Sequence, residues 1–280
     1  MGESPLYDHR TNTLLWIDAT GKKILRRNLD EVLEQSTDCP ELISSIQLTE
    51  ITGELMCTMM HQFCRINLET GKFVTLGEVE RDLERNRFND GKCDLSGRYW
   101  AGTMNIDSVY PNPGIPTASL YVLDLDKTIR RTLGGLSISN GLVWSIDSST
   151  MYLVDTPIKK VFQFDFDLKA GEIHNQRICI DFKDEEGRPD GMTIDSEGML
   201  WIAHARAARL SRWDPKTGQK VSEFLLPTKG TTSVIFGGKK LDTLYVTSGS
   251  DLSSDDYAGY VYVLEGTGAR GFESNICKVH

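Results

Sequence analysis

The sequence predicts an all-β protein, a six-bladed β-propeller that forms one domain over residues 1–280. Two observations carry this prediction. Short apolar runs recur at a nearly even spacing, and within the runs apolar and polar residues alternate with the period of two that is typical of β-strands. Helical periodicity is hard to find. The best helical candidate, 30–38 (DEVLEQSTD), lies in a connecting segment and would form one or two turns at most.

The apolar runs repeat six times along the chain. The first large residue of each run marks the repeat, and the gaps between these residues are 41, 43, 53, 48 and 44 positions. Propeller blades repeat about every 40 to 50 residues, so the spacing favours six blades. A pair of β-sandwiches or another all-β array is the alternative. The six marker residues are Leu15, Met56, Tyr99, Tyr152, Leu200 and Leu244.

Each repeat contains a second strand-like run after a short polar link, as in 119–126 (SLYVLDLD) and 259–268 (GYVYVLEGTG). These runs end in Asp and Gly, the residues that make turns. Each unit is therefore expected to run strand, turn, strand, turn. Arranging such units in a ring leaves only short, protected sheet edges.

Composition excludes several kinds of partner. The net charge is −9 and the pI is about 5.1, which argues against nucleic acid or an anionic membrane and is compatible with small molecules and divalent cations. Six cysteines show no CxxC pairing and are expected to be free thiols, which favours a cytoplasmic protein. No apolar run is long enough to span a membrane, and no signal peptide is visible. We expect a monomer or a weak homodimer.

Polar clusters lie about 10 to 12 residues ahead of four of the repeat markers, in 2–5 (GESP), 87–94 (RFNDGKCD), 136–144 (LSISNGLVW) and 187–195 (GRPDGMTID). Loops at equivalent positions of a radial array converge on one face, so Glu3, Asn89, Asn140 and Asp190 are expected to meet near the axis. Carboxylate and amide oxygens suit calcium, magnesium or manganese, and zinc also accepts carboxylates.

Each cluster also has an ordinary explanation. Asn140-Gly141 is a strong hairpin signal, and Asp190-Gly191 is another turn dipeptide. The segment 89–91 (NDG) is predicted to be a sharp turn leading into the third blade. Both interpretations of the clusters, turn and site, therefore stay open on the pattern alone.

Several long segments resemble the SMP-30/gluconolactonase/luciferin-regenerating enzyme family. They are 2–8 (GESPLYD), 14–18 (LLWID), 86–104 (NRFNDGKCDLSGRYWAGTM), 137–156 (SISNGLVWSIDSSTMYLVDT), 187–205 (GRPDGMTIDSEGMLWIAHA) and 236–249 (FGGKKLDTLYVTSG). They follow the family order and cover nearly the whole chain.

The resemblance implies a propeller with one divalent metal ion at the mouth of the axial tunnel. Calcium is the first choice, with zinc, magnesium or manganese as alternatives. The ligands would be Glu3, Asn140 and Asp190, and the substrate contacts would be Arg87 and Asn89. Asp107 is a weaker substrate-contact match, because family members usually have Glu there. Family enzymes hydrolyse sugar lactones, others act on different lactones, and one branch regenerates luciferin.

The chemistry implied is metal-dependent lactone hydrolysis. The metal would polarise the lactone carbonyl, Asp190 would accept a proton from the attacking water, and Arg87 and Asn89 would orient the substrate. The sequence has no GxSxG motif for an acyl-enzyme route. The alternatives are hydrolysis of a non-sugar lactone or a phosphoester, luciferin regeneration, and a non-catalytic calcium-binding propeller.

Two departures from the family pattern raise further expectations. Relatives carry about a dozen residues before the Glu that corresponds to Glu3. Either the tail 272–280 therefore closes the ring or the last blade lacks an edge strand. Because Glu3 lies close to the chain terminus, it is also expected to fray and to bind metal more weakly. His204 and Arg206 stand where small residues are common. They either shape a different substrate pocket or, for His204, form an ordinary hydrogen-bonded strand position. Asp94 and Arg98 are expected to brace the loop near Asn89.

Overall fold

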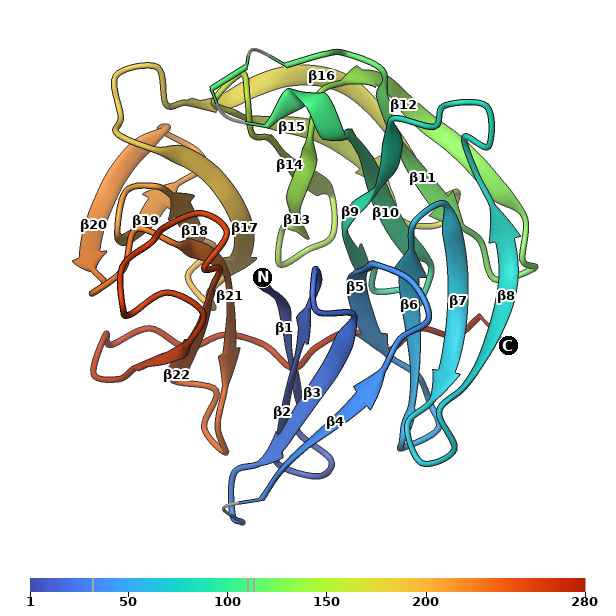
Figure 1. Cartoon of the computed structure of the whole chain (residues 1–280). Coiled ribbons are helices and arrows are strands. Elements are labelled where there is room, and N and C mark those ends of the chain that lie inside the picture. The colour runs from blue at the N-terminus through green and yellow to red at the C-terminus, as the bar shows by residue number, and fades with distance from the viewer. Residues whose placement is uncertain (32, 110, 113, 280) are drawn as a thin grey trace.

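The computed structural model describes residues 1–31, 33–109, 111–112 and 114–279. Six antiparallel sheets are arranged around a central axis (Figure 1), which confirms the six-bladed β-propeller. The first three blades are β1 (Gly2–Asp8), β2 (Thr13–Asp18), β3 (Lys23–Asn28) and β4 (Glu34–Asp38); β5 (Ile43–Leu48), β6 (Glu54–Met59), β7 (Gln62–Asn67) and β8 (Lys72–Glu78); and β9 (Asn86–Cys93), β10 (Tyr99–Asn105), β11 (Ala118–Leu123) and β12 (Ile129–Leu136).

The other three blades follow in the same order along the chain. They are β13 (Ser139–Trp144), β14 (Thr150–Asp155), β15 (Lys160–Asp167) and β16 (Glu172–Asp181); β17 (Arg188–Ile194), β18 (Leu200–Ala205), β19 (Arg209–Asp214) and β20 (Gln219–Leu225); and β21 (Thr231–Gly237), β22 (Thr243–Ser248) and β23 (Val261–Leu264). The six marker residues of the repeat all lie on the second strands of the blades, so the spacing located the blades correctly.

The first strand of each blade lines the axis. β1, β5, β9, β13, β17 and β21 each contact the first strand of both neighbouring blades, and β1 meets β21 to complete the ring. Large side chains fill the space between blades. Trp100 of β10, for example, packs edge-on against Trp144 of β13 and Phe166 of β15, with ring centroids 6.1 and 5.7 Å apart. The first strands are thus held rigidly, which suits them to carry a site.

The predicted brace near the third blade is present. The buried Asp94 carboxylate accepts hydrogen bonds from the Arg98 backbone N–H (3.0 Å), the Arg98 guanidinium (3.1 Å) and the indole N–H of Trp100 (3.0 Å). The fifth blade repeats the arrangement, since Asp195 accepts from the Trp201 indole at 2.8 Å. These carboxylates support the blades and do not face the axis.

The helical turn expected over 30–38 is wrong where the structure describes this segment. Residues Glu34–Asp38 form β4, the outer strand of the first blade, and Val32 lies outside the described residues. The strand pairs with β3 from Lys23↔Asp38 to Arg27↔Glu34, and the ladder overrides the weak helical pattern. Among the described residues the helical segment is one 3₁₀ turn, Ile106–Ser108, and no helix is long and apolar enough to cross a membrane.

The last blade has three described strands, so of the two ring-closure alternatives the missing edge strand is the one observed. The C-terminal tail adds no strand to this sheet. It runs across one end of the axis (Figure 1, red), where backbone hydrogen bonds tie it to the sixth, second and third blades. They are Gly271 N to Leu241 O (2.8 Å), Cys277 N to Leu48 O (2.7 Å) and Lys278 N to Gly97 O (3.0 Å).

The N-terminal strand does not fray as expected. The Met1 ammonium pairs with Asp18 and donates to Thr20 Oγ1 at 2.9 Å, and the Met1 carbonyl accepts from Ala19 N at 2.8 Å. Glu3 therefore sits in a strand that is held at its first residue. All six cysteines are free, as predicted.

Candidate metal and substrate site

The predicted site residues lie on the first strands of their blades, and a β-bulge stands at the same place in all six of these strands. The register with the second strand shifts between Glu3 and Leu6, Ile43 and Ser45, Phe88 and Asp90, Ser139 and Leu142, Pro189 and Met192, and Thr231 and Ser233. A bulge inserts an extra residue and re-aims its side chain. Asn89, Asn140 and Asp190 lie within these bulges, and Glu3 borders one.

The turn interpretation of these clusters is wrong. Asn140-Gly141 and Asp190-Gly191 lie inside β13 and β17, and 89–91 lies inside β9. Their glycines serve close packing between blades, because a Cβ on Gly141 would stand 2.6 Å from the Asp190 carbonyl oxygen. The Asn-Gly and Asp-Gly pairs that usually mark hairpins here mark bulges.

The bulge residues join each blade to the next. Ser44 Oγ donates to the Phe88 carbonyl (2.7 Å), Asn89 Nδ2 to the Ser139 carbonyl (2.9 Å) and Thr232 Oγ1 to the Gly2 carbonyl (2.7 Å). These bonds form a belt around the axis and hold the functional side chains in place.

One oxygen of Asp190 takes no part in this belt of hydrogen bonds, whereas the neighbouring Asn140 does. Asn140 Nδ2 donates to Thr156 Oγ1 (3.0 Å), which donates on to the Pro189 carbonyl (2.9 Å). Asp190 itself is only 6% exposed, and its Oδ1 has no hydrogen-bond partner among the described residues. A buried carboxylate oxygen without a partner is costly and calls for a proton or a cation.

Electrostatics confirm that the acidic residues come together. Burial, with the nearby charge of Asp90, raises the pKa of Asp190 to about 8, while hydrogen bonds from Asn140 and Gly191 oppose the shift. Burial and the charges of Asp190 and Asp90 also raise the pKa of Glu3. Glu3 and Asp190 are 187 positions apart in the chain, and the fold has brought them within reach of one another.

Asp90 is the residue that sequence reasoning missed. It neighbours both predicted metal-ligand carboxylates, and burial raises its pKa to about 6, while Lys92 and the Gly91 N–H oppose the shift. The signal was present in the sequence, because Asp90 is adjacent to Asn89. The pattern does not show that the bulge between Phe88 and Asp90 brings Asp90 close to Glu3 and Asp190 as well.

Arg87 and Asn89 both reach the axis. Arg87 is enclosed deeply enough that burial lowers its pKa to about 10, against the opposing charge of Glu3. Its guanidinium donates to the Phe88 carbonyl at 2.8 Å, which leaves further N–H groups for a ligand. Asn89 donates one amide N–H to the Ser139 carbonyl, which leaves its second N–H and its side-chain oxygen for a ligand.

Asp107 lies apart from this group in the contacts of the described residues. It sits on the exposed 3₁₀ turn after β10, where it forms an ion pair with Arg85, and this pairing lowers the pKa of its carboxyl. Its role as a substrate contact stays a prediction.

His204 is a core residue of the fifth blade. Its Nε2 is 2.6 Å from Ser211 Oγ, its ring packs edge-on against Phe182 at 5.3 Å, and burial lowers its pKa to about 3. Of the two interpretations, the hydrogen-bonded strand position holds. Arg206 occupies a turn with a φ of 67°, where its backbone N–H donates to the Lys229 carbonyl at 2.7 Å.

The buried His204 leads to a prediction about acid stability. A His whose pKa is about 3 when folded and about 6.5 when unfolded binds its proton only on unfolding between these values, so stability falls with decreasing pH by about 1.4 kcal/mol per pH unit in this window. We expect the variant His204→Gln to lose this slope in urea titrations at pH 4.5 to 6.5. The exposed control His174→Gln should keep it, and an unchanged slope in His204→Gln would contradict the assignment.

The donor set fits a hard divalent cation. Among the described residues no three His, Cys, Asp or Glu side chains are gathered closely enough to form a metal site by themselves, so the set depends on the Asn140 amide oxygen in addition to Glu3 and Asp190. The unpartnered Asp190 oxygen is an acceptor of the kind that such a cation binds, and a cation there would offset the burial that raises the pKa of both carboxyls.

A six-bladed propeller whose bulged inner strands bring carboxylates, amides and an arginine to the axis is a fold built around an axial polar site. The chain belongs to the SMP-30/gluconolactonase/LRE-like family, whose model matches residues 1–250. Regucalcin from Gallus gallus is 39% identical over 282 residues, covering 97% of this chain and 92% of the relative.

Two further likenesses extend over the whole fold. An uncharacterized protein from Sulfolobus acidocaldarius is 40% identical over 275 residues, covering 98% of this chain and 95% of that protein. The solved structure of a luciferin-regenerating enzyme superimposes with a TM-score of 0.93 at 33% identity, covering 99% of this chain and 95% of the other.

Proposed function

We propose that this protein is a metal-dependent lactonase that opens sugar lactones at the axial site. Glu3, Asn140 and Asp190 would hold one divalent cation, for which calcium suits the all-oxygen set best and zinc, magnesium and manganese are alternatives. The observation that carries the proposal is the buried Asp190 carboxylate, whose Oδ1 has no hydrogen-bond partner among the described residues and which lies near Glu3 and Asp90, beside an Arg87 guanidinium with N–H bonds to spare. Membership of a family that includes gluconolactonases supports the reaction class.

The chain's own residues supply binding and proton transfer. The Arg87 guanidinium and the Asn89 amide oxygen would orient the substrate's hydroxyl and ring oxygens, one as donor and the other as acceptor. Asp190 would accept the proton of the attacking water, and Asp90 is a second carboxylate at hand for this step. The rigid belt of bulges keeps these groups in fixed positions, so little reorganisation is needed when charge develops on the carbonyl oxygen.

The bound cation would supply Lewis-acid polarisation of the lactone carbonyl. The role of the cation is tested by an assay of gluconolactone hydrolysis in which proton release is measured in a weakly buffered solution. The assay is run with calcium, magnesium, manganese or zinc, and with EDTA. We expect turnover in the presence of at least one of these metals and its loss in EDTA. The variant Asp190→Ala should lose turnover with every metal.

The variant Asp90→Asn separates the two candidate bases. A loss in Asp90→Asn as deep as that in Asp190→Ala would assign Asp90 a part in proton transfer. Full activity of Asp190→Ala would overturn the site. If wild type binds calcium but opens no lactone in a panel of sugar and non-sugar lactones, the lactonase proposal fails and a binding role replaces it.

A further inference from the structure

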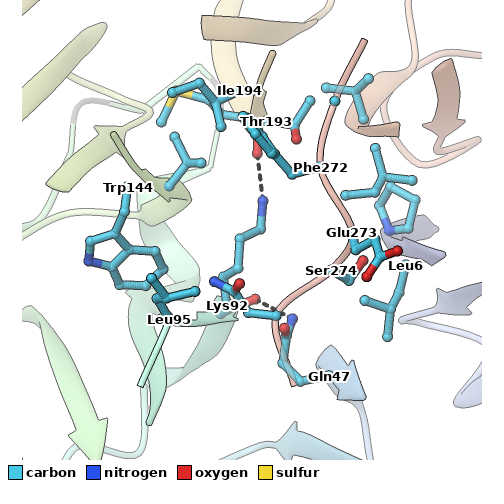
Figure 2. Close-up of a pocket in the computed structure, with 18 of the residues that line it drawn as sticks. Leu6, Gln47, Lys92, Leu95, Trp144, Thr193, Ile194, Phe272, Glu273 and Ser274 are labelled. Atoms are coloured by element: carbon cyan, nitrogen blue, oxygen red, sulfur yellow. Dashed lines mark hydrogen bonds between the residues drawn. The ribbon is translucent and has the colours of Figure 1, made fainter. Parts of the chain in front are cut away.

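The axial tunnel has a second end, opposite the candidate metal site, and it opens into a cavity of about 720 Å³. The site residues stand near the beginnings of the first strands, whereas the cavity is lined by residues further along them, such as Leu6, Lys92 and Ile194. The C-terminal tail supplies another wall. Figure 2 shows Lys92 reaching through the middle of the cavity, with Trp144 and Leu95 on one side and Phe272, Glu273 and Ser274 on the other.

Most of the cavity wall is apolar. Side chains from four blades and from the tail contribute to it, including Leu6, Val143, Trp144, Ile194, Ile235 and Ile276. A cavity of several hundred Å³ in which a mainly apolar wall also carries polar side chains is the usual form of a small-molecule site. The wall predicts a ligand with an apolar body.

Large apolar side chains also surround the mouth of the cavity. Leu95 is 57% exposed, Ile146 53% and Phe272 43%. These residues come from the third and fourth blades and from the tail, and they line one cavity. Exposed apolar groups gathered at an opening are typical of an entry for an apolar ligand.

Lys92 is one of four charged residues that line the cavity, together with Asp90, Glu273 and Lys278. Its Nζ donates to the Met192 carbonyl oxygen at 2.9 Å, which uses one of its three N–H bonds. No carboxylate of the described residues lies within 4 Å of this ammonium, and Asp90 at the inner end attracts it only from further away. An ammonium with N–H bonds to spare among apolar walls favours an anionic partner.

The charged side chains at the rim do not provide the Lys92 ammonium with an anionic partner. Glu273 turns to the imidazole of His9, 3.2 Å from its Oε2, and its side chain is exposed. Lys278, also on the tail, adds a second positive charge to the lining. Gln47 donates to the Ile46 and Gly91 carbonyls, at 2.6 and 3.1 Å, and accepts from Cys93 N at 3.2 Å, so it is already bonded.

We infer that this cavity binds a small carboxylate with an apolar body, such as a medium-chain aliphatic acid, with the carboxylate on Lys92 and the body against Trp144 and its apolar neighbours. Asp90 is common to the lining of this cavity and to the candidate metal site, whereas Lys92, Trp144 and the tail belong to the cavity alone. The inference does not depend on the proposed lactonase activity.

The test is calorimetric titration of the full chain with octanoate and with the neutral octanamide, in EDTA so that no cation can hold the carboxylate. We expect saturable binding of octanoate. In Lys92→Met the octanoate affinity should fall at least tenfold, as expected for the loss of one charge-assisted hydrogen bond, while octanamide binding changes less than about threefold. The surface variant Lys239→Met, which also removes one positive charge, should bind octanoate like wild type.

A second variant keeps the test decisive if Lys92→Met does not fold. Leu95→Glu places a negative charge at the exposed mouth, where folding tolerates it, and should weaken octanoate more than octanamide. The inference is overturned if wild type shows no saturable binding of octanoate in EDTA. It is also overturned if Lys92→Met, when folded, and Leu95→Glu both bind octanoate as tightly as Lys239→Met. Binding that requires added calcium and disappears in Asp190→Ala would place the carboxylate at the other end of the tunnel and would equally refute it.

Discussion

The variant Asp190→Asn is expected to be more stable than wild type in the absence of metal at pH 8. Folded Asp190 has a pKa of about 8, well above its ordinary value, because it is buried near Asp90. The folded protein therefore holds a proton that the unfolded chain has released, and stability is lost as the pH rises from about 4 towards 8. Asparagine removes this ionisation at similar volume. We expect a gain on the order of 3 kcal/mol, or roughly 5 to 10 °C in the thermal midpoint.

Added calcium should reverse the order of thermal stability, so that wild type becomes more stable than Asp190→Asn. Thermal melts at pH 8 in EDTA and in excess calcium are the measurement, and we expect calcium to stabilise wild type strongly and Asp190→Asn little, because a ligand that binds only the folded state stabilises it by mass action. The exposed control Asp126→Asn should respond to calcium like wild type. If Asp190→Asn is destabilised in EDTA, the buried charge of Asp190 does not cost stability. If calcium stabilises both proteins equally, Asp190 is not a metal ligand.

Replacement of Arg87 by leucine is expected to lower kcat/KM for gluconolactone by about a hundredfold or more. The charge of Glu3 acts on the buried Arg87 guanidinium, which donates one hydrogen bond to the Phe88 carbonyl and keeps further N–H groups for a ligand. Loss of a positioned, charged donor costs about 2 to 4 kcal/mol in comparable sites.

The design separates substrate contact from support of the fold. Arg87→Lys keeps the charge but not the planar fork and should recover only part of the activity. Arg81→Leu removes an exposed arginine that pairs with Glu78 and should leave kcat/KM unchanged. Wild-type kcat/KM in a folded Arg87→Leu protein would remove Arg87 from the substrate site.

The spacing predicted the strands on which the metal-ligand candidates lie, but not the local structure of these strands. Their role as metal ligands stays a prediction. The spacing of the polar clusters placed Glu3, Asn140 and Asp190 at equivalent points of three blades, and the fold brings them to the axis. Asn-Gly and Asp-Gly were interpreted as turns because local preference favours turns there. Packing between blades decides otherwise, since Gly141 lies against the Asp190 backbone of the next blade and Gly191 against Ser233 of the one after.

Contacts between distant residues also explain the features that the sequence did not predict. Asp90, the surroundings of His204 and the pairing of Asp107 with Arg85 depend on contacts between residues far apart in the chain or on a one-residue shift of register. A shift of one residue moves a strand side chain to the opposite face, and no local pattern records it. The course of the tail across the tunnel is likewise set by hydrogen bonds to three blades.

The sequence by itself determined six blades and the strand on which each repeat marker lies, because alternation and repeat spacing are properties of neighbouring positions. Only the tertiary structure decided that bulges carry these residues, that Asp90 joins Asp190 and Glu3, and that a tail-walled cavity encloses Lys92 at the other end. These features arise where strands from different blades meet, and their energies come from burial and from charges that the chain brings together only when the ring closes.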